Sequence, residues 1–272
     1  MKNSPSCLIF LHVPKTAGSS VRGILGMNYS SKATFLAREM WKDNPNYYAL
    51  DQNSREHLSL LMGHMPFGLH TSIGNGSIEY FTLLREPTAR ILSLYQHILR
   101  YDDHHFANEM QAKKYTLQEI LQLKLLPAFD NCQVRMLSGN MHAPFGTLTN
   151  SDLKQAIQNL EKHFPVAGIQ ERFDEFVLLL ADRYAWRFPY YRKLKVAPQQ
   201  KDSKPLEDAT LELILNCNQL DMELYQYVAA RFDKQVKERG PLFLRKLQKY
   251  QRNNRWFQKV TRLMPFYFKA VE

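Results

Sequence analysis

Apolar and polar residues follow one another along this chain in blocks that predict alternating strands and helices. Four short apolar runs predict buried strands, at residues 7–13, 58–62, 80–84 and 164–169. Apolar residues at helical spacing predict helices that start near residue 21 and at Pro87, and others over 117–137, 151–163, 174–184 and 206–232. Because strands alternate with helices, we predict an α/β domain with a central, mostly parallel sheet.

Three stretches do not fit this alternation. Residues 28–56 are polar and aromatic without a clear period, and we expect them to be irregular or weakly helical. Residues 189–205 carry three prolines among lysines, a composition typical of a mobile surface loop. Residues 240–272 hold eight Lys or Arg and one acid, with apolar residues at helical spacing. We therefore predict a main domain over 1–239 and a basic amphipathic helical tail over 240–272.

The composition is that of a globular protein with an excess of positive charge. Hydrophobic residues make up 44% of the 272, and 36 Lys and Arg against 26 Asp and Glu give a formal net charge of +10. This excess favours an anionic ligand, which could be a nucleotide, a nucleic acid, an acidic glycan or a membrane surface. Three widely spaced cysteines without a CxxC pair disfavour a disulfide framework or a zinc site. Since we also find no signal peptide or membrane span, we expect a reduced, cytoplasmic setting.

The segment PKTAGSS, residues 14–20, combines the groups that a phosphate requires. A loop that closes onto a helix N-terminus offers backbone N–H donors and a favourable dipole. Lys15 adds a positive charge, and Gly18 lets the backbone come close to a ligand. Hydroxyl groups are supplied by Thr16, Ser19 and Ser20. The lysine precedes the glycine, so the pattern GxxxxGK[ST] is absent, which disfavours an ordinary nucleotide triphosphatase. A plain surface turn is the alternative.

A second candidate phosphate site lies in LREPTARILSLY, residues 84–95. Arg85 is predicted at the carboxyl end of a strand, where parallel sheets bind their ligands. Ser93 follows about two turns into the next helix, so the guanidinium and the hydroxyl can grip one phosphate. Arg90 is a further basic candidate. The alternative is an exposed ion pair between Arg85 and Glu86, which would have no functional role.

Together these two motifs resemble the 5′-phosphosulfate loop and the 3′-phosphate motif of carbohydrate sulfotransferases. The nearest resemblance is to the heparan sulfate 2-O-sulfotransferase-like group and its bacterial members. Further stretches resemble that group in the same order, namely GHMPFG at 63–68, DNCQVRMLSG at 130–139, GIQERFDE at 168–175 and LDMELY at 220–225. The resemblance covers residues 7 to about 232, and its specificity comes from two ligand motifs in the right order with landmarks between and after them.

The resemblance implies a P-loop-type three-layer fold and 3′-phosphoadenosine-5′-phosphosulfate (PAPS) as the sulfuryl donor, with no metal. It implies that the 5′-phosphosulfate is held by Pro14, Lys15, Thr16, Ala17, Gly18, Ser19 and Ser20. It further implies Arg85 and Ser93 on the 3′-phosphate. His64 matches the histidine that acts as general base in this group, and Lys15 would stabilise the charge of the leaving group. Some relatives carry a second histidine two residues earlier, where this chain has Met62.

Other residues could take part in the chemistry. His12 precedes the phosphate loop but is predicted in a strand, where a structural role is the simpler interpretation. A polar stretch contributes His104 and His105, which could line an acceptor site or face solvent. Two lysines of the proline-containing loop, Lys201 and Lys204, could close over a nucleotide. For Glu86 and Arg172, an ion pair is the simpler interpretation. We assign no role in the site to Arg135 or Arg172.

The resemblance implies transfer of a sulfuryl group from PAPS to an acceptor hydroxyl on a carbohydrate, while a lipid, a peptide tyrosine or a small metabolite stays open. A nucleotide-dependent kinase of related P-loop fold and a non-catalytic PAPS-binding protein are the competing hypotheses. A nucleic-acid partner is not expected, because the charge is concentrated in the tail and no binding module is recognised. The tail itself could pack on the domain, steer an anionic acceptor or contact an anionic membrane from the cytoplasmic side.

Overall fold

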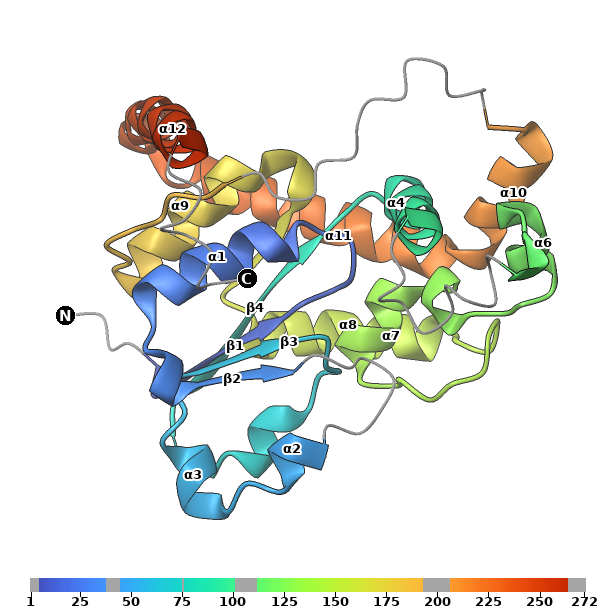
Figure 1. Ribbon diagram of the computed structural model, residues 1–272, viewed down its shortest axis with the longest axis horizontal. Helices are drawn as coiled ribbons and strands as arrows, with labels where there is room; N and C mark the ends of the chain where they lie inside the picture. The colour runs from blue at the N-terminus through green and yellow to red at the C-terminus, as the bar shows by residue number, and fades with distance from the viewer. Residues whose placement is uncertain (1–4, 38–44, 75, 101–111, 193–205, 264–272) are drawn as a thin grey trace.

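The computed structural model describes residues 5–37, 45–74, 76–100, 112–192 and 206–263. A five-stranded, all-parallel sheet lies at its centre, in the order β2-β3-β1-β4-β5 (Figure 1). The strands span β1 (Cys7–Leu11), β2 (Thr34–Ala37), β3 (Leu60–Gly63), β4 (Ile78–Leu84) and β5 (Val166–Ile169). Helices cover both faces of this sheet, so the predicted three-layer α/β fold with a parallel sheet is confirmed.

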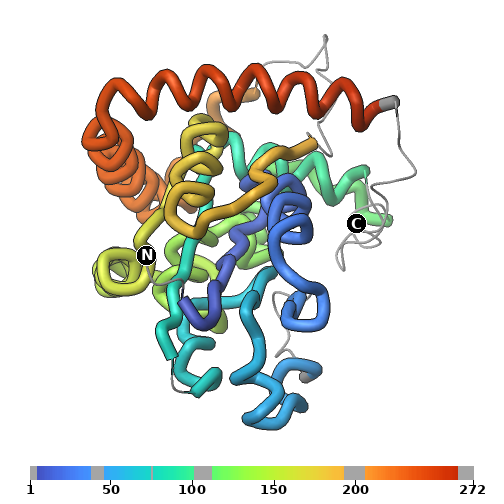
Figure 2. Tube along the Cα trace, turned by 90° about the vertical axis from the view of Figure 1, so that its left-hand side faces the viewer, coloured from blue at the N-terminus to red at the C-terminus, as the bar shows by residue number. Residues whose placement is uncertain are grey.

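Helices α1 and α9 lie on one side of the sheet, and α7 and α8 lie on the other (Figures 1 and 2). The longer helices of the described residues are α1 (Gly18–Asn28), α4 (Pro87–Arg100), α8 (Asn150–His163), α9 (Phe173–Tyr184), α10 (Asp208–Cys217), α11 (Gln219–Lys237) and α12 (Gly240–Leu263). Shorter helices are α2 (Pro45–Tyr48), α3 (Gln52–Glu56), α6 (Leu117–Gln122) and α7 (Cys132–Ser138). None of the described helices is both long enough and apolar enough to cross a membrane.

All four predicted strands are present, but β2 was missed. It falls in the stretch 28–56, which we expected to be irregular or weakly helical. β2 runs parallel to β3, with Thr34 opposite Leu60 and Ala37 opposite Gly63. It is a four-residue edge strand in which three residues are only partly buried. Its apolar run, Phe35 to Ala37, is only three residues long, which is too short for the hydrophobic pattern to indicate a strand.

Two long predicted helices are each broken. The stretch 117–137 contains α6, a 3-10 turn and α7, separated where Lys124 and Asn131 adopt positive φ angles of 54° and 41°. The stretch 206–232 contains α10 and α11, which meet at the fully buried Asn218. The Asn218 amide donates to Phe129 O and to Ile214 O, both at 3.0 Å. A side chain that satisfies backbone carbonyls in this way ends one helix and fixes the start of the next.

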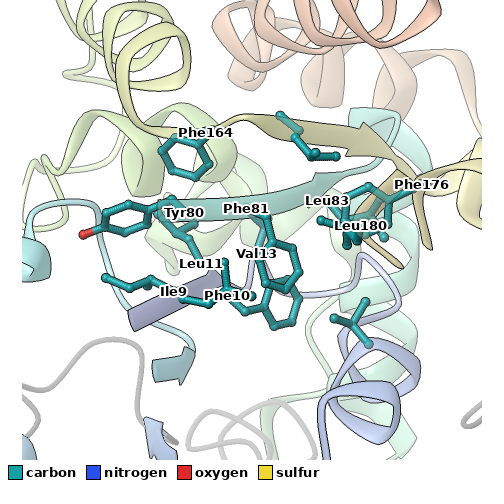
Figure 3. Close-up of a cluster of buried hydrophobic side chains, with 14 of the residues drawn as sticks. Ile9, Phe10, Leu11, Val13, Tyr80, Phe81, Leu83, Phe164, Phe176 and Leu180 are labelled. Carbon is teal, nitrogen blue, oxygen red and sulfur yellow. The ribbon is translucent and has the colours of Figure 1, made fainter. Parts of the chain in front are cut away.

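The strands that carry the motifs are held by an aromatic core. Phe10 of β1 stacks on Phe81 of β4 with ring centroids 4.8 Å apart, and both side chains are buried (Figure 3). Phe81 continues the contact to Phe176 of α9. The buried Thr82 hydroxyl donates to Leu11 O at 2.8 Å, which ties β4 to the carboxyl end of β1. Burial of each such aromatic ring stabilises the fold by about 1.5–3 kcal/mol, so the carboxyl ends of β1 and β4 are rigidly placed.

Candidate active site

The predicted phosphate loop connects the carboxyl end of β1 with the N-terminus of α1. It is anchored to β3, because His12 N donates to Gly63 O at 3.0 Å. Lys15 and Ala17 adopt positive φ angles of 70° and 63°, a region that non-glycine residues rarely occupy. Ala17 is the N-cap of α1. Two left-handed residues so close together turn successive backbone N–H groups toward the same side of the loop. A concave loop of this kind binds anions.

The three hydroxyls of the loop differ in what they do. The Thr16 side chain is fully buried, and its hydroxyl donates to Val13 O at 2.8 Å, which holds the turn closed. The Ser20 hydroxyl donates to Arg192 O at 3.0 Å. Ser19 lies partly exposed in the first turn of α1, and its hydroxyl forms no hydrogen bond with the side chain or backbone of any described residue. Of the three, Ser19 is therefore the hydroxyl that is available to a ligand without giving up an existing bond.

The side chain of His12 leaves room only for glycine at position 18. A Cβ atom added at Gly18 would lie 1.7 Å from His12 Nε2, so the imidazole of His12 packs directly against this backbone position. We expected Gly18 to make room for a phosphate, and the space in front of its α-carbon is taken by His12 instead. Any larger residue at position 18 would displace the ring of His12 or the start of α1.

His64 follows β3 and lies directly beside His12. Their ring centroids are 4.2 Å apart with an interplanar angle of 28°, and both side chains are partly buried. His64 Nδ1 lies 2.9 Å from His12 O. Because a carbonyl oxygen only accepts, this bond requires a proton on Nδ1, which leaves a lone pair on Nε2 of the neutral ring. The proton-accepting nitrogen of the neutral His64 ring is thus Nε2.

The electrostatic surroundings keep both imidazoles neutral. Burial lowers the pKa of His64, the hydrogen bond to His12 opposes this, and the positive charges of Arg22 and Lys15 lower the pKa further. Burial lowers the pKa of His12 well below the ordinary value, and His64 is the next cause. A neutral His64 at pH 7 can accept a proton, which is the state a general base needs.

Sequence reasoning treated His12 as a structural residue and found no two-histidine arrangement. The structure does bring a second histidine next to His64, but it is His12, which directly follows β1, and not a residue at position 62. The parallel register sets Leu11 opposite Gly63, so the residues that follow the two strands are neighbours. The register of β1 and β3 could have predicted that His12 and His64 are neighbours, but it can be assigned only once the strand order is known.

Arg85 connects the two phosphate motifs. It follows β4, and its Nη1 donates to Lys15 O at 3.2 Å, so the guanidinium reaches the first loop. Its backbone is held on both sides by one side chain, because Arg85 N donates to Gln133 Oε1 and Gln133 Nε2 donates to Arg85 O, each at 3.0 Å. Burial lowers the pKa of Arg85, and Glu171 and Glu86 oppose that shift. Sequence reasoning missed Gln133, which is fully buried and 48 positions away.

The remaining residues of the second motif, Ser93, Glu86 and Arg90, differ in exposure and in their hydrogen-bond partners. Ser93 lies on α4 and is partly exposed. The Glu86 carboxylate accepts from Thr88 N and Ala89 N at 2.9 and 2.7 Å, so it caps α4. Arg90 is fully buried and donates to Ala128 O at 2.9 Å, so it faces the protein interior rather than a ligand site.

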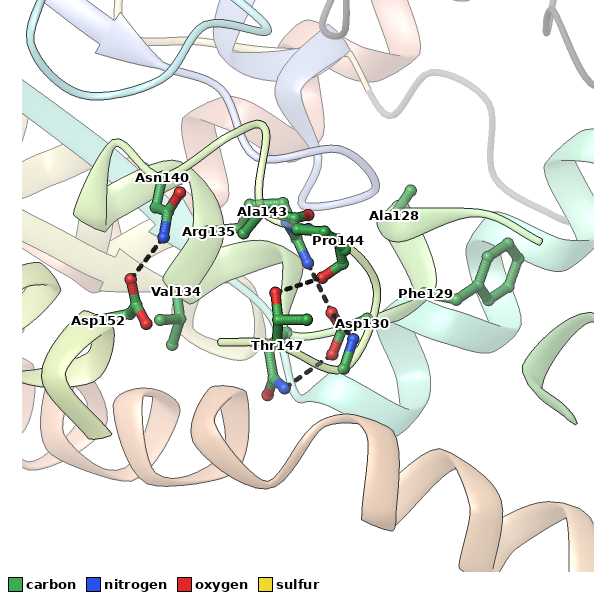
Figure 4. A network of polar contacts seen from close by, with 12 residues as sticks. Ala128, Phe129, Asp130, Val134, Arg135, Asn140, Ala143, Pro144, Thr147 and Asp152 are labelled. Carbon is green, nitrogen blue, oxygen red and sulfur yellow. Dashed lines mark hydrogen bonds and ion pairs between the residues drawn. The ribbon is translucent and has the colours of Figure 1, made fainter. Parts of the chain in front are cut away.

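The segment that presents Gln133 is fixed by a buried polar network. The fully buried Asp221 carboxylate accepts from Gln133 N and Val134 N at 3.1 and 2.8 Å, at the start of α7. Asp130 forms an ion pair with Arg135 at 2.5 Å, and Arg135 also donates to Ala143 O (Figure 4). These contacts give Arg135 a structural role and hold Gln133 independently of its side-chain bonds to Arg85.

Other candidates lie away from these motifs or outside the described residues. Arg172 pairs with Glu175 at 2.6 Å and with Asp233, as expected for a helix-start ion pair. His104, His105, Lys201 and Lys204 fall outside the described residues. A surface hollow lined in part by Pro165 and Val166 lies at the amino end of β5, opposite the edge where parallel sheets bind ligands. Within the described part of the chain, no three His, Cys, Asp or Glu side chains gather as metal ligands would.

Comparison with known proteins supplies an independent observation. A sequence model of the galactose-3-O-sulfotransferase family matches residues 2–263. The match begins before β1, contains both phosphate motifs and His64, and ends at the last residue of α12. No curated protein matches the chain.

Proposed function

Because the chain belongs to the galactose-3-O-sulfotransferase family, whose members sulfate carbohydrates, we propose that PAPS is its sulfuryl donor and His64 its general base. The observation that carries this proposal is the geometry of His64. Its ring stacks on His12 beside the phosphate loop, and its Nδ1 bond to His12 O leaves Nε2 free to take a proton. A base with this tautomer, next to an anion-binding loop, is what deprotonation of a sugar hydroxyl beside an activated sulfate requires.

The donor would be held at two ends. The loop N–H groups, Lys15 and the hydroxyl of Ser19 would hold the 5′-phosphosulfate, with Pro14 to Ser20 forming the wall of this subsite. Arg85 and Ser93 would hold the 3′-phosphate. The bond from Arg85 Nη1 to Lys15 O supports this division, because it sets the two subsites at a fixed separation. The residues present therefore fit a nucleotide with two separate phosphate groups.

In the proposed sulfuryl transfer, His64 and Lys15 have different roles. His64 Nε2 accepts the proton of the acceptor hydroxyl while that oxygen forms a bond to sulfur. The bond between sulfur and the 5′-phosphate oxygen breaks, and negative charge gathers on that oxygen. Lys15 and the loop N–H groups stabilise this charge, as positioned charges do in phosphoryl transfer. His64 can keep its proton until release because the His12 carbonyl stabilises the imidazolium through Nδ1–H.

The acceptor belongs to the same proposal. The family match and the sequence resemblance both indicate a carbohydrate hydroxyl as acceptor. The family match indicates galactose, and the resemblance indicates the polysaccharide heparan sulfate. We take a galactose residue as the first acceptor to test, because the match covers nearly the whole chain. Heparan sulfate that lacks 2-O-sulfate is the second acceptor.

The test is transfer of labelled sulfate from PAPS to these acceptors. Substituting His64→Ala should lower kcat by about 10²–10⁴-fold, the usual contribution of a general base, and leave donor affinity unchanged. His163→Ala is the matched control, since His163 is also partly buried with a lowered pKa but lies at the end of α8. Turnover of the His64 variant at the wild-type rate would rule out its role as base. Donor binding without turnover in the wild type would favour a non-catalytic binding protein.

A further inference from the structure

Helix α12 lies across the outside of the molecule with one face against the domain (Figure 2). Phe243 and Tyr250 are buried on that inner face, and the Tyr250 hydroxyl donates to Pro189 O at 2.9 Å. Asn254 Oδ1 accepts from Tyr191 N at 3.0 Å. Lys246 forms an ion pair with Asp182 of α9. The inner face is therefore occupied by the protein itself, and any further role of the helix belongs to its outer face.

The outer face is strongly basic. Arg245, Arg252 and Lys259 follow one another every seven residues, which is close to two helical turns, so they form a line of charges about 10 Å apart. All three are exposed, as are three flanking basic residues, Lys249, Arg255 and Arg262. We call these six residues the basic face. No acidic residue occurs in 240–263, and none of the six pairs with an acid in the described part of the chain.

Exposed apolar side chains accompany this charge. Trp256 is 67% exposed within the basic face, and Leu242 and Leu244 are 78% and 52% exposed near the start of the helix. Eight large apolar side chains of the described residues are exposed in all, and half of them lie on α12 or on the neighbouring segment 186–191, namely Phe188, Leu242, Leu244 and Trp256. This concentration separates α12 from an ordinary solvated helix, whose outer face would mix charges of both signs.

We propose that the basic face of α12 binds a membrane surface that contains anionic lipids. Lys and Arg attract an anionic leaflet, and an exposed tryptophan prefers the boundary between headgroups and acyl chains. The apolar side chains favour a lipid surface over a polyanionic glycan or a nucleic acid, since phosphate or sulfate groups alone would need only the charges. The inner face stays on the domain, so the helix docks as part of the folded protein.

The test is flotation of the full chain with vesicles of phosphatidylcholine alone or with phosphatidylserine added. We expect flotation only with phosphatidylserine, and less of it at high salt. Each basic residue near an anionic surface strengthens binding about fivefold, so the triple variant Arg245→Gln, Arg252→Gln, Lys259→Gln should bind about a hundredfold more weakly. Trp256→Ala should weaken binding without changing its salt dependence.

The matched control carries the same loss of charge elsewhere. Lys124, Lys154 and Lys162 are exposed and lie off α12, and their triple glutamine variant should float like the wild type. Equal flotation of the α12 variant and the wild type, or no flotation with phosphatidylserine, would overturn the proposal. Binding of heparin or DNA without vesicle binding would assign the basic face to a polyanion and overturn it as well. No donor or acceptor enters the assay, so its result is independent of the proposed function.

Discussion

Gln133 offers a sharp test of how the donor site is held, because its only side-chain partner among the described residues is the backbone of Arg85. Gln133→Leu keeps the size of the side chain and removes both 3.0 Å hydrogen bonds. Each bond contributes about 0.5–1.5 kcal/mol net, so the loss totals about 1–3 kcal/mol. The Asp221 carboxylate still holds the start of α7, because it accepts from the backbone N–H groups of residues 133 and 134 and not from the Gln133 side chain. We therefore expect a folded protein with a displaced Arg85.

The assay is titration with adenosine 3′,5′-bisphosphate, the product form of the donor. If about half of the lost free energy falls on binding, the Kd rises about two- to tenfold, since about 1.4 kcal/mol corresponds to a factor of ten. Gln235→Leu is the matched control, because Gln235 donates to Pro165 O at 2.9 Å at the amino end of β5. It should lose stability and keep donor affinity. Wild-type affinity in the Gln133 variant would refute the reasoning that Gln133 positions Arg85.

Three further predictions address the loop, the base and the tail. Gly18→Ala sets a methyl group against the His12 ring, so kcat/KM should fall by more than tenfold in steady-state kinetics. Burial lowers the pKa of His64, so kcat should rise with pH along a limb centred below about 6.5, and His64→Ala should lack this limb. Removal of residues 240–272 takes away the buried Phe243 and Tyr250 and uncovers the surface they pack on, including Tyr190, so unfolding should shift to lower temperature by several degrees in a thermal scan.

Stability should also depend on the partly buried pair of His12 and His64. Burial lowers the pKa of His12 in the folded state well below its value in the unfolded chain. The unfolded state therefore binds more protons, and stability rises with pH up to about 6.5 and falls as the pH drops below it. Urea unfolding of the wild type and of His12→Phe at several pH values measures this, and an equally steep decline in both proteins would contradict it.

The sequence predicts those parts of the fold whose signals are local. The strands β1 and β4 are continuous apolar runs that end in the phosphate motifs, and Pro87 lies at the first turn of α4, as predicted. The edge strand β2 escapes prediction because it is partly exposed and its apolar run is only three residues long. The break between α10 and α11 depends on the Asn218 side chain, whose partner Phe129 is 89 positions away.

The sequence indicates candidate residues for the site, but it does not indicate how they contact one another. The two motifs indicate Lys15 and Arg85, because each motif follows an apolar strand, and the family resemblance indicates His64. The stacking of His12 on His64 requires the order and register of β1 and β3, which no local pattern contains. Gln133 requires the path of the chain from β4 to α7. Long-range contacts of this kind arise from tertiary packing, which a single sequence does not display.

The proposed function requires this chain to bind a nucleotide with separate 5′ and 3′ phosphates and to use it as sulfuryl donor. Titration of the purified protein with adenosine 3′,5′-bisphosphate, with ATP in parallel, tests it most directly. We predict tight binding of the bisphosphate, weak binding of ATP, and loss of bisphosphate binding in Lys15→Ala and Arg85→Ala. No binding of the bisphosphate, or a preference for ATP, would contradict the assignment of both motifs and favour a nucleotide-dependent kinase.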